Sequence, residues 1–172
     1  TASQPNQRWQ QLYESLELKS YKNWKSPSVQ SIKEDFADFK RKEEKWENRA
    51  RIILLQTPLF TDFDDFREKV LNGEIREIDR AFAGKIHGMA AVSSVAALKS
   101  LVKTYSKPRD VDRIVNGIKN EEKLPMPIIV KGKDGMWVLS GNTRCNASFA
   151  LGFKPKVIII DLSKEESGEA DV

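Results

Sequence analysis

The sequence contains very little cysteine or histidine, with one of each among 172 residues. A single cysteine excludes an intramolecular disulfide framework and an all-cysteine zinc site, and one histidine cannot complete a mixed site. The chain also lacks an apolar run of the ~18 residues that a membrane helix needs, and its N-terminus has no signal-peptide pattern. We therefore expect no bound metal of this kind and no membrane partner, and we predict a cytoplasmic location.

Charge of one sign is not in large excess either. The 29 Lys and Arg residues outnumber the 25 Asp and Glu residues by four, which gives a net charge of +4. This balance weakly favours a phosphate-bearing partner, but no basic block is as long as a nucleic-acid-binding tail. Hydrophobic residues make up 40% of the chain. That fraction supports a packed core and excludes global disorder.

Helical spacing dominates the N-terminal part of the sequence. Apolar residues at three- and four-residue steps predict helices over about 7–18, 31–56 and 61–71, with Thr61 as the N-cap of the third. We interpret residues 1–72 as a helical region. The aromatic residues there lie among lysines and could stack on nucleobases, but we favour packing of a helical layer: Trp9, Tyr21, Trp24 and Trp46.

From residue 73 onward, strand and turn signals alternate with helices. We predict a strand over 74–79, a loop over 80–89, and helices over 94–105 and 110–120 that begin at Ser94 and Asp110. A hairpin of strands 128–131 and 136–139 turns at Asp134-Gly135, a helix follows Gly141 to about residue 151, and 156–161 is a buried strand.

This order predicts an α+β domain over residues 73–162, followed by an acidic disordered tail over 163–172. We expect one set of apolar residues to be largely buried. The set comprises Trp46, Phe63, Phe66, Val102, Ile114, Ile129 and residues 157–160.

The turn between the second hairpin strand and the next helix contains residues suited to bind an anion. Gly141 permits a sharp turn and close approach of a ligand, and the first backbone N–H groups of a helix attract anions. Ser140, Asn142 and Thr143 add polar side chains, and the fork of Arg144 suits phosphate. We interpret 140–144 as a phosphate cradle distinct from the Walker motif, which is absent. The plain alternative is a helix cap beside a surface arginine.

The surroundings of this turn resemble the ParB/sulfiredoxin-like superfamily over about residues 74–162. Its members show a helix, then G-x-x-x-P-P-I-x-V, then d-G-x-y-x-l-x-G-x-x-R-x-x-A. The corresponding segments here are IKNEEKLPMPIIV at 118–130 and DGMWVLSGNTRCNA at 134–147. The resemblance implies a small α+β domain that binds a nucleotide's phosphates at the turn. The superfamily includes CTP-hydrolysing partition proteins, ATP-dependent sulfiredoxins and a free-serine kinase.

Departures from these patterns bear on the activity. Partition proteins have G-E-R-R, whereas Asn142 and Thr143 follow the glycine here. Sulfiredoxins have G-G-C-H-R with the cysteine two residues before the arginine, where this chain has Asn142, so we do not expect Cys145 to be catalytic. The kinase pattern D-G-H-H-R keeps only Gly141 and Arg144 here.

Phosphoryl transfer also needs a base or a carboxylate. In the fold that the resemblance implies, the strand that opens the domain and the loop after it face the turn. This makes Glu77, Asp79 and His87 the catalytic candidates, although each could be an ordinary surface group. We expect ATP or another nucleoside triphosphate with Mg²⁺ as cofactor, in a phosphotransferase or NTPase. The alternative is a non-catalytic DNA-binding or protein-interaction module, and a third possibility is a degenerate pocket.

Overall fold

The computed structural model describes residues 18–42, 44–45, 59–105, 108–133 and 135–163. Within these residues the chain forms an α+β fold, as the sequence predicts. The described residues leave out 1–17, which hold nearly all of the predicted helix over 7–18, and 46–56, the last part of the predicted helix over 31–56. They also leave out the tail after 163 and the residues Trp9, Trp46 and Asp134. The five strands of the main sheet are β3 Glu74–Glu77, β4 Ile86–His87, β6 Ile128–Lys131, β7 Met136–Ser140 and β9 Lys156–Asp161.

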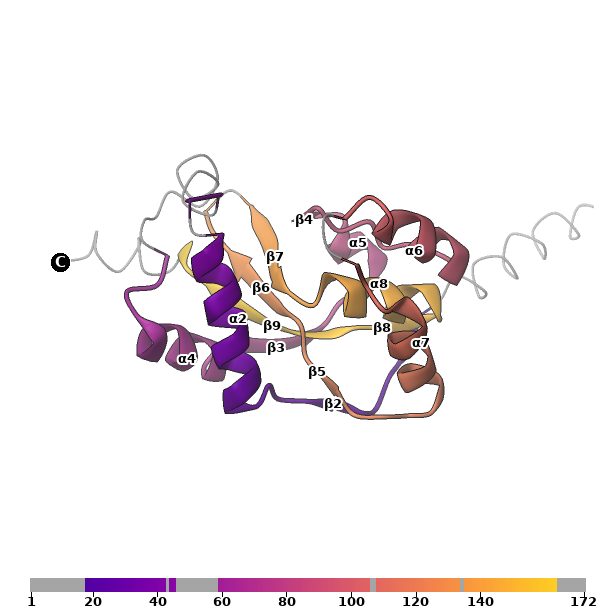
Figure 1. The fold of residues 1–172 in the computed structure, drawn as a ribbon, viewed down its shortest axis with the longest axis horizontal. Coiled ribbons are helices and arrows are strands. Elements are labelled where there is room, and N and C mark those ends of the chain that lie inside the picture. The colour runs from indigo at the N-terminus through magenta and orange to yellow at the C-terminus, as the bar shows by residue number, and fades with distance from the viewer. Residues whose placement is uncertain (1–17, 43, 46–58, 106–107, 134, 164–172) are drawn as a thin grey trace, which may run out of the picture.

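The main sheet is mixed and has the order β3-β9-β6-β7-β4 (Figure 1). Strands β6 and β7 form the predicted antiparallel hairpin, and β6 also pairs with β9 in parallel. The predicted bounds of β6 and β9 are confirmed, and β7 extends one residue further, to Ser140. Strands β3 and β4 form the two opposite edges of this sheet.

Strand β9 is buried on both faces, which explains its continuous apolar sequence. Ile158 and Ile160 face one core cluster, whereas Val157 and Ile159 face the other. Ile129 of β6 is fully buried in the second cluster. The expected burial of residues 157–160 and of Ile129 is therefore confirmed.

Two helices cover one face of the sheet. They are α2 Val29–Arg41 and α4 Phe63–Leu71. Phe36 of α2 packs against Phe63 and Phe66 of α4, with ring centroids 5.8 and 5.3 Å apart. Phe66 is fully buried as expected, whereas Phe63 is only partly buried. Figure 1 shows this pair at the left of the view and the remaining helices at the right.

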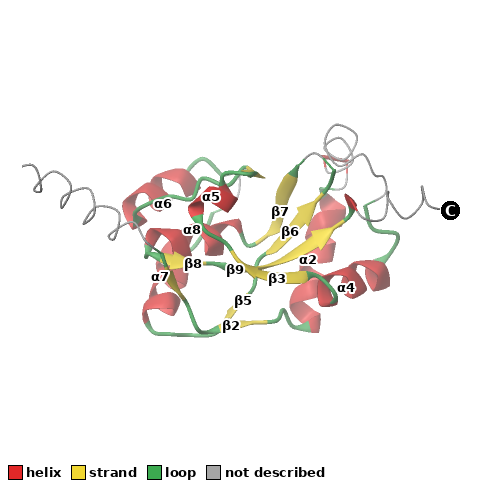
Figure 2. Cartoon of the chain, turned by 180° about the vertical axis from the view of Figure 1, so that it is seen from behind, coloured by secondary structure: helices red, strands yellow, loops and turns green. Residues whose placement is uncertain are grey.

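The remaining helices pack together at the C-terminal end of β7. They are α5 Arg80–Ala83, α6 Val95–Val102, α7 Val111–Lys119 and α8 Asn142–Ala150. Leu98, Val115 and Ala147 join α6, α7 and α8 in a third core cluster. Val102 and Ile114, which we expected to be largely buried, pack only partly against this cluster. Figure 2 shows the same arrangement from behind.

Residues 18–28 are not helical, so the region that we interpreted as helical, residues 1–72, contains a non-helical segment between its first and second predicted helices. The segment contains two short strands, β1 Lys19–Ser20 and β2 Trp24–Lys25. They pair in parallel with β8 Phe153–Lys154 and β5 Leu124–Pro125. Two-residue strands carry no hydrophobic period that a sequence pattern could reveal.

The aromatic residues of this segment pack inside the protein, in agreement with the interpretation that we favoured. Tyr21 is buried, and its ring meets Trp24 and Phe153 edge-on at 5.7 and 5.5 Å between centroids. Trp24 packs against two of the core clusters. These two rings are therefore part of the core rather than a platform for nucleobases.

Two local predictions are corrected. Helix α4 begins one residue later than predicted, because Asp62 rather than Thr61 is its N-cap and accepts a hydrogen bond from the backbone N–H of Asp65 at 2.8 Å. The predicted loop over 80–89 contains α5 and β4. Asp79 caps α5, and β4 gains its order by pairing with β7. None of the helices among the described residues has the length and apolar character needed to cross a membrane.

Candidate functional site

The predicted turn over 140–144 lies where β7 ends and α8 begins. Gly141 is the N-cap of α8 and has a φ of +93°, a backbone conformation that favours glycine. A Cβ atom at this position would lie only 2.7 Å from Cβ of Pro127. The turn therefore needs glycine both for its conformation and for its close packing.

Helix α8 begins without a side-chain cap, unlike the other five helices in the described part of the chain. Its first backbone hydrogen bond runs from the N–H of Cys145 to the carbonyl of Gly141, at 2.9 Å. The N–H groups of residues 142–144 precede this bond, so they have no acceptor within the helix. They carry the positive end of the helix dipole and attract an anion.

Arg144 lies in the first turn of α8 and is half-buried. Its Nη2 atom lies 2.8 Å from the position that a Cβ of Gly141 would occupy, so the guanidinium covers the turn. Its Nε atom is buried and has no hydrogen-bond partner within the described residues. Burial lowers the pKa of Arg144, and the nearby carboxylate of Asp35 offsets part of this effect. A cation at this end of a helix also opposes the dipole.

Asp35 reaches the turn from α2, which precedes it by more than a hundred residues. The hydroxyl of Ser140 donates a hydrogen bond to Oδ1 of Asp35, with 2.9 Å between the oxygens. Burial raises the pKa of Asp35, while the Ser140 hydrogen bond and the positive charge of Arg144 act in the opposite direction. We call Ser140 and Asp35 the cleft pair.

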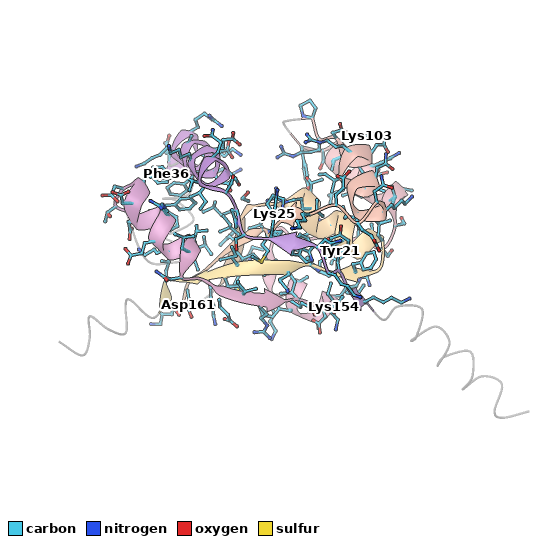
Figure 3. The ribbon with its side chains drawn as sticks, turned by 90° about the horizontal axis from the view of Figure 1, so that it is seen from below. Tyr21, Lys25, Phe36, Lys103, Lys154 and Asp161 are labelled. Atoms are coloured by element: carbon cyan, nitrogen blue, oxygen red, sulfur yellow. The ribbon has the colours of Figure 1, made fainter. Side chains whose placement is uncertain are left out.

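These groups open onto a cleft of about 480 Å³, which we call the α2–α8 cleft. It is lined by Glu34, Asp35, Asp38, Lys42, Arg109, Ile114, Val138, Leu139 and residues 140–144. Figure 3 shows the helical group that contains Phe36 on one side and the group that ends near Lys103 on the other, with Lys25 between them. The cleft contains both signs of charge: α2 contributes three carboxylates and its C-cap residue Lys42, and Arg109 and Arg144 contribute positive charge opposite them.

The side chain of Asn142 is held within the protein. Its Oδ1 atom accepts a hydrogen bond from Nδ2 of Asn146 at 2.6 Å, and its own Nδ2 lies 3.4 Å from the carbonyl oxygen of Gly88. Asn146 is fully buried, and its Oδ1 accepts from the N–H of Val92 at 3.2 Å. This network fixes the start of α8 against residues 88–92. Asn142 thus supports the turn mainly by holding it in position.

The structure brings only one of the three predicted catalytic residues near the turn. His87 lies on the edge strand β4, where its ring stacks on Trp137 of β7 at 4.7 Å between centroids. The next residue, Gly88, is the one that Asn142 approaches. His87 is therefore a neighbour of the cleft, although it is not among the lining residues.

Glu77 and Asp79 lie away from the turn. Glu77 belongs to β3, the sheet edge opposite β4, and accepts a hydrogen bond from the hydroxyl of Ser20 at 3.0 Å. Asp79 caps α5 by accepting from the N–H of Phe82 at 2.8 Å. The neighbouring Arg80 donates to the carbonyl of Phe149, at the C-terminal end of α8. The structure therefore does not bring these two carboxylates together with residues 140–144.

The sequence did not predict Asp35, whose carboxylate accepts the hydrogen bond of Ser140. Asp35 lies on a helix with other acidic residues, and nothing in the local pattern distinguishes it from a solvent-exposed charge. Only the packing of α2 beside β7 brings it to Ser140. A contact of this kind leaves no signal in a single sequence.

Cys145 follows Arg144 but faces the core. It is fully buried, and burial raises the pKa of its thiol to about 12. A protonated, buried thiol is a poor nucleophile. Among the residues that the structure describes, no group of three or more His, Cys, Asp and Glu side chains is arranged to hold a metal ion.

We compared the chain with protein-family models, with curated proteins and with solved structures, and none of them matches it. The α+β class is confirmed by the structure. The resemblance to the ParB/sulfiredoxin-like superfamily stays a prediction that rests on the quoted motifs.

Proposed function

We propose that the protein binds the phosphate groups of a nucleoside triphosphate in the α2–α8 cleft and uses this site for phosphoryl transfer or nucleotide hydrolysis. The N–H groups of residues 142–144 and the guanidinium of Arg144 would hold the phosphates. The cleft volume of about 480 Å³ falls in the range of ordinary small-molecule sites.

The observation that carries this proposal is the position of Arg144. Its buried Nε atom has no hydrogen-bond partner in the described residues, and its charge lies at the wrong end of a helix for the dipole. An unpaired buried donor and an opposed charge both cost free energy, and the nearby carboxylate of Asp35 offsets only part of that cost. A phosphate group bound by the uncapped N–H groups would satisfy both.

The carboxylates on α2 favour a small ligand over a nucleic acid. An extended phosphate backbone that entered the cleft would approach Glu34 and Asp35, which repel it. The third carboxylate of the cleft, Asp38, is already paired with Arg41 and Lys42. A compact nucleotide can place its phosphates at Arg144 without running along α2. Binding of DNA through the same turn is therefore the weaker candidate, and it becomes an outcome of the test below.

We expect Mg²⁺ to accompany the nucleotide. Mg²⁺ is usually held by one or two carboxylates together with substrate phosphates, and α2 contributes carboxylates to the cleft lining. The ion would neutralise part of the negative charge that the phosphates carry during transfer.

A thermal-shift screen of ATP, ADP, CTP and GTP with Mg²⁺ tests the proposal. We expect at least one nucleotide to raise the melting temperature of the protein, because a ligand that binds only the folded state stabilises it. Arg144→Ala should weaken that affinity by about ten- to a hundredfold, since a charge-assisted hydrogen bond contributes roughly 1.5–3 kcal/mol.

The matched control is Arg113→Ala. Arg113 is an exposed arginine on α7 that does not line the cleft, so its loss should leave nucleotide affinity unchanged. Unchanged affinity in a folded Arg144→Ala protein contradicts the proposal. Steeply salt-dependent DNA binding that survives excess nucleotide would favour the DNA-binding alternative instead.

A further inference from the structure

We infer that the hydroxyl of Ser140 is a phosphoryl acceptor in this site, with the carboxylate of Asp35 as its general base. The inference rests on the proposed function, because the donor is the nucleoside triphosphate bound at the turn. It goes further by assigning a covalent phosphoserine intermediate and by naming the two residues that form it.

The direction of the hydrogen bond supports this assignment. The Ser140 hydroxyl donates its proton to Oδ1 of Asp35 over 2.9 Å. A nucleophile whose proton is already shared with a carboxylate has the arrangement of an activated hydroxyl. Because the proton is directed toward Asp35, the lone pairs of the Ser140 oxygen are directed elsewhere.

The location of the pair supports it as well. Ser140 directly precedes Gly141, the N-cap of α8, and both residues of the pair line the same cleft as residues 141–144. Asp35 is half-buried beside α8, and burial makes its carboxylate more basic than an exposed aspartate. Base, nucleophile and anion-binding groups thus share one cavity.

The reaction step balances without any further reactant. The Ser140 oxygen forms a bond to the terminal phosphorus of the nucleotide, and the bond from that phosphorus to the bridging oxygen breaks. The nucleoside diphosphate leaves with the bonding electron pair, and the proton of Ser140 moves to Oδ1 of Asp35. Water or a second substrate can then take the phosphoryl group from Ser140.

The molecule provides a matched control in a second serine–carboxylate hydrogen bond. The hydroxyl of Ser20 donates to Oε2 of Glu77 at 3.0 Å, but this pair is exposed and lies outside the cleft. We call Ser20 and Glu77 the edge pair. If a serine–carboxylate hydrogen bond alone were sufficient, both serines would be phosphorylated, whereas our inference expects only Ser140 to react.

The experiment is an acid-quenched time course of the full chain with γ-³²P-labelled ATP, GTP or CTP and Mg²⁺, under single-turnover conditions. Phosphoserine survives the acid quench, so a short-lived intermediate is captured, and phosphopeptide mapping by mass spectrometry locates it. We expect label on Ser140 and no label on Ser140→Ala. Asp35→Asn, which keeps a hydrogen-bond acceptor of the same shape, should slow labelling by about 10²–10⁴-fold. Ser20→Ala should label as the unmodified protein does.

Each outcome decides the question. Nucleotide binding that depends on Arg144, without label on Ser140 at any time, overturns the inference and leaves the proposed function intact. Label on another residue also overturns it. Labelling of Asp35→Asn at the full rate overturns it as well, because the hydrogen bond from Ser140 to Asp35 would then be purely structural. Absence of nucleotide binding overturns the proposed function and this inference together.

Discussion

The cleft pair and the edge pair are chemically alike and differ in their surroundings. Each joins a serine hydroxyl to a carboxylate from a distant part of the chain, across 105 positions in the cleft and 57 at the edge. Asp35 of the cleft pair is half-buried and faces Arg144, whereas the edge pair is exposed to solvent. Burial, rather than the residue types, therefore distinguishes the candidate site from the surface contact.

The largest expected effect comes from changing the backbone beneath the cleft pair. Gly141→Ala should lower the free energy of unfolding by about 2–5 kcal/mol, because the new Cβ combines a strained φ with overpacking. Displacement of the Arg144 guanidinium should also weaken nucleotide binding at least tenfold. Urea unfolding and the thermal-shift screen measure the two effects.

Gly152→Ala is the control for the first prediction. Gly152 has a φ of +84°, but nothing lies within 4 Å of the Cβ position, so only backbone strain of about 1–2 kcal/mol is expected. An equal loss for the two variants would show that close packing at Gly141 contributes nothing.

The second prediction compares the arginines at the two ends of α8. Arg144→Ala should leave the unliganded stability unchanged or raise it, because it removes a desolvated cation from the positive end of the helix. Arg80→Ala should lower stability by about 1–2 kcal/mol, because Arg80 donates to the carbonyl of Phe149 at 2.9 Å, at the helix end where a cation is favourable.

Nucleotide affinity should depend on the other arginine. It should fall about ten- to a hundredfold in Arg144→Ala and stay unchanged in Arg80→Ala. Calorimetric titration measures the affinity of both variants, and urea unfolding measures their stability. Two variants that lose stability and affinity in parallel would argue against a ligand role for Arg144.

The third prediction concerns Cys145, which directly follows Arg144. Cys145→Ser should cost about 1–3 kcal/mol of stability, because it buries a hydroxyl in an apolar cluster. Phosphoryl transfer should continue, since a buried thiol with a pKa of about 12 supplies no thiolate at neutral pH. A folded variant that binds nucleotide but no longer reacts would assign the thiol a chemical role.

The smallest effect concerns the pH dependence of stability. Burial raises the pKa of Asp35 above its ordinary value of 3.8, so the folded state holds this proton more tightly than the unfolded state does. The contribution of Asp35 to stability therefore falls as pH rises from about that value through the raised pKa, and it stays lower above it. Relative to the unmodified protein, Asp35→Asn should become more stable over the same window.

Urea unfolding at pH 4 and pH 7 measures this difference. Glu77→Gln is the control from the edge pair, and we expect a change of less than about 0.5 kcal/mol at both pH values, because Glu77 is exposed. A stability gain for Asp35→Asn that shrinks as pH rises would contradict the assigned environment of Asp35.

Local signals in the sequence were sufficient for much of the fold. The Asp134-Gly135 turn and the apolar run over 157–160 located β6, β7 and β9, and Ser94 and Asp110 marked the starts of two helices. These features depend on residues that are close together in the chain. Helix α5 was missed because it is short and is stabilised by its N-cap Asp79. Strand β4 was missed because it forms only by pairing with β7.

The candidate site likewise has one part that the sequence predicts and one part that it does not. The turn over 140–144 is visible in the sequence because glycine, polar residues and an arginine follow a strand within a few positions. Asp35 was not among the predicted candidates, which were Glu77, Asp79 and His87, because the approach of α2 to β7 is a tertiary contact. The polarity of the cleft likewise follows from packing and not from any local motif.

The wide separation of the cleft pair along the chain has a consequence for biosynthesis. Ribosomes add about 5–20 residues per second, so Asp35 is made about 5–20 s before Ser140, 105 positions later. Until β7 and α8 leave the ribosome, α2 has neither its sheet nor its hydroxyl partner. The nascent chain therefore carries the Asp35 carboxylate without its serine partner, and the cleft is complete only after β7 and α8 have been synthesised.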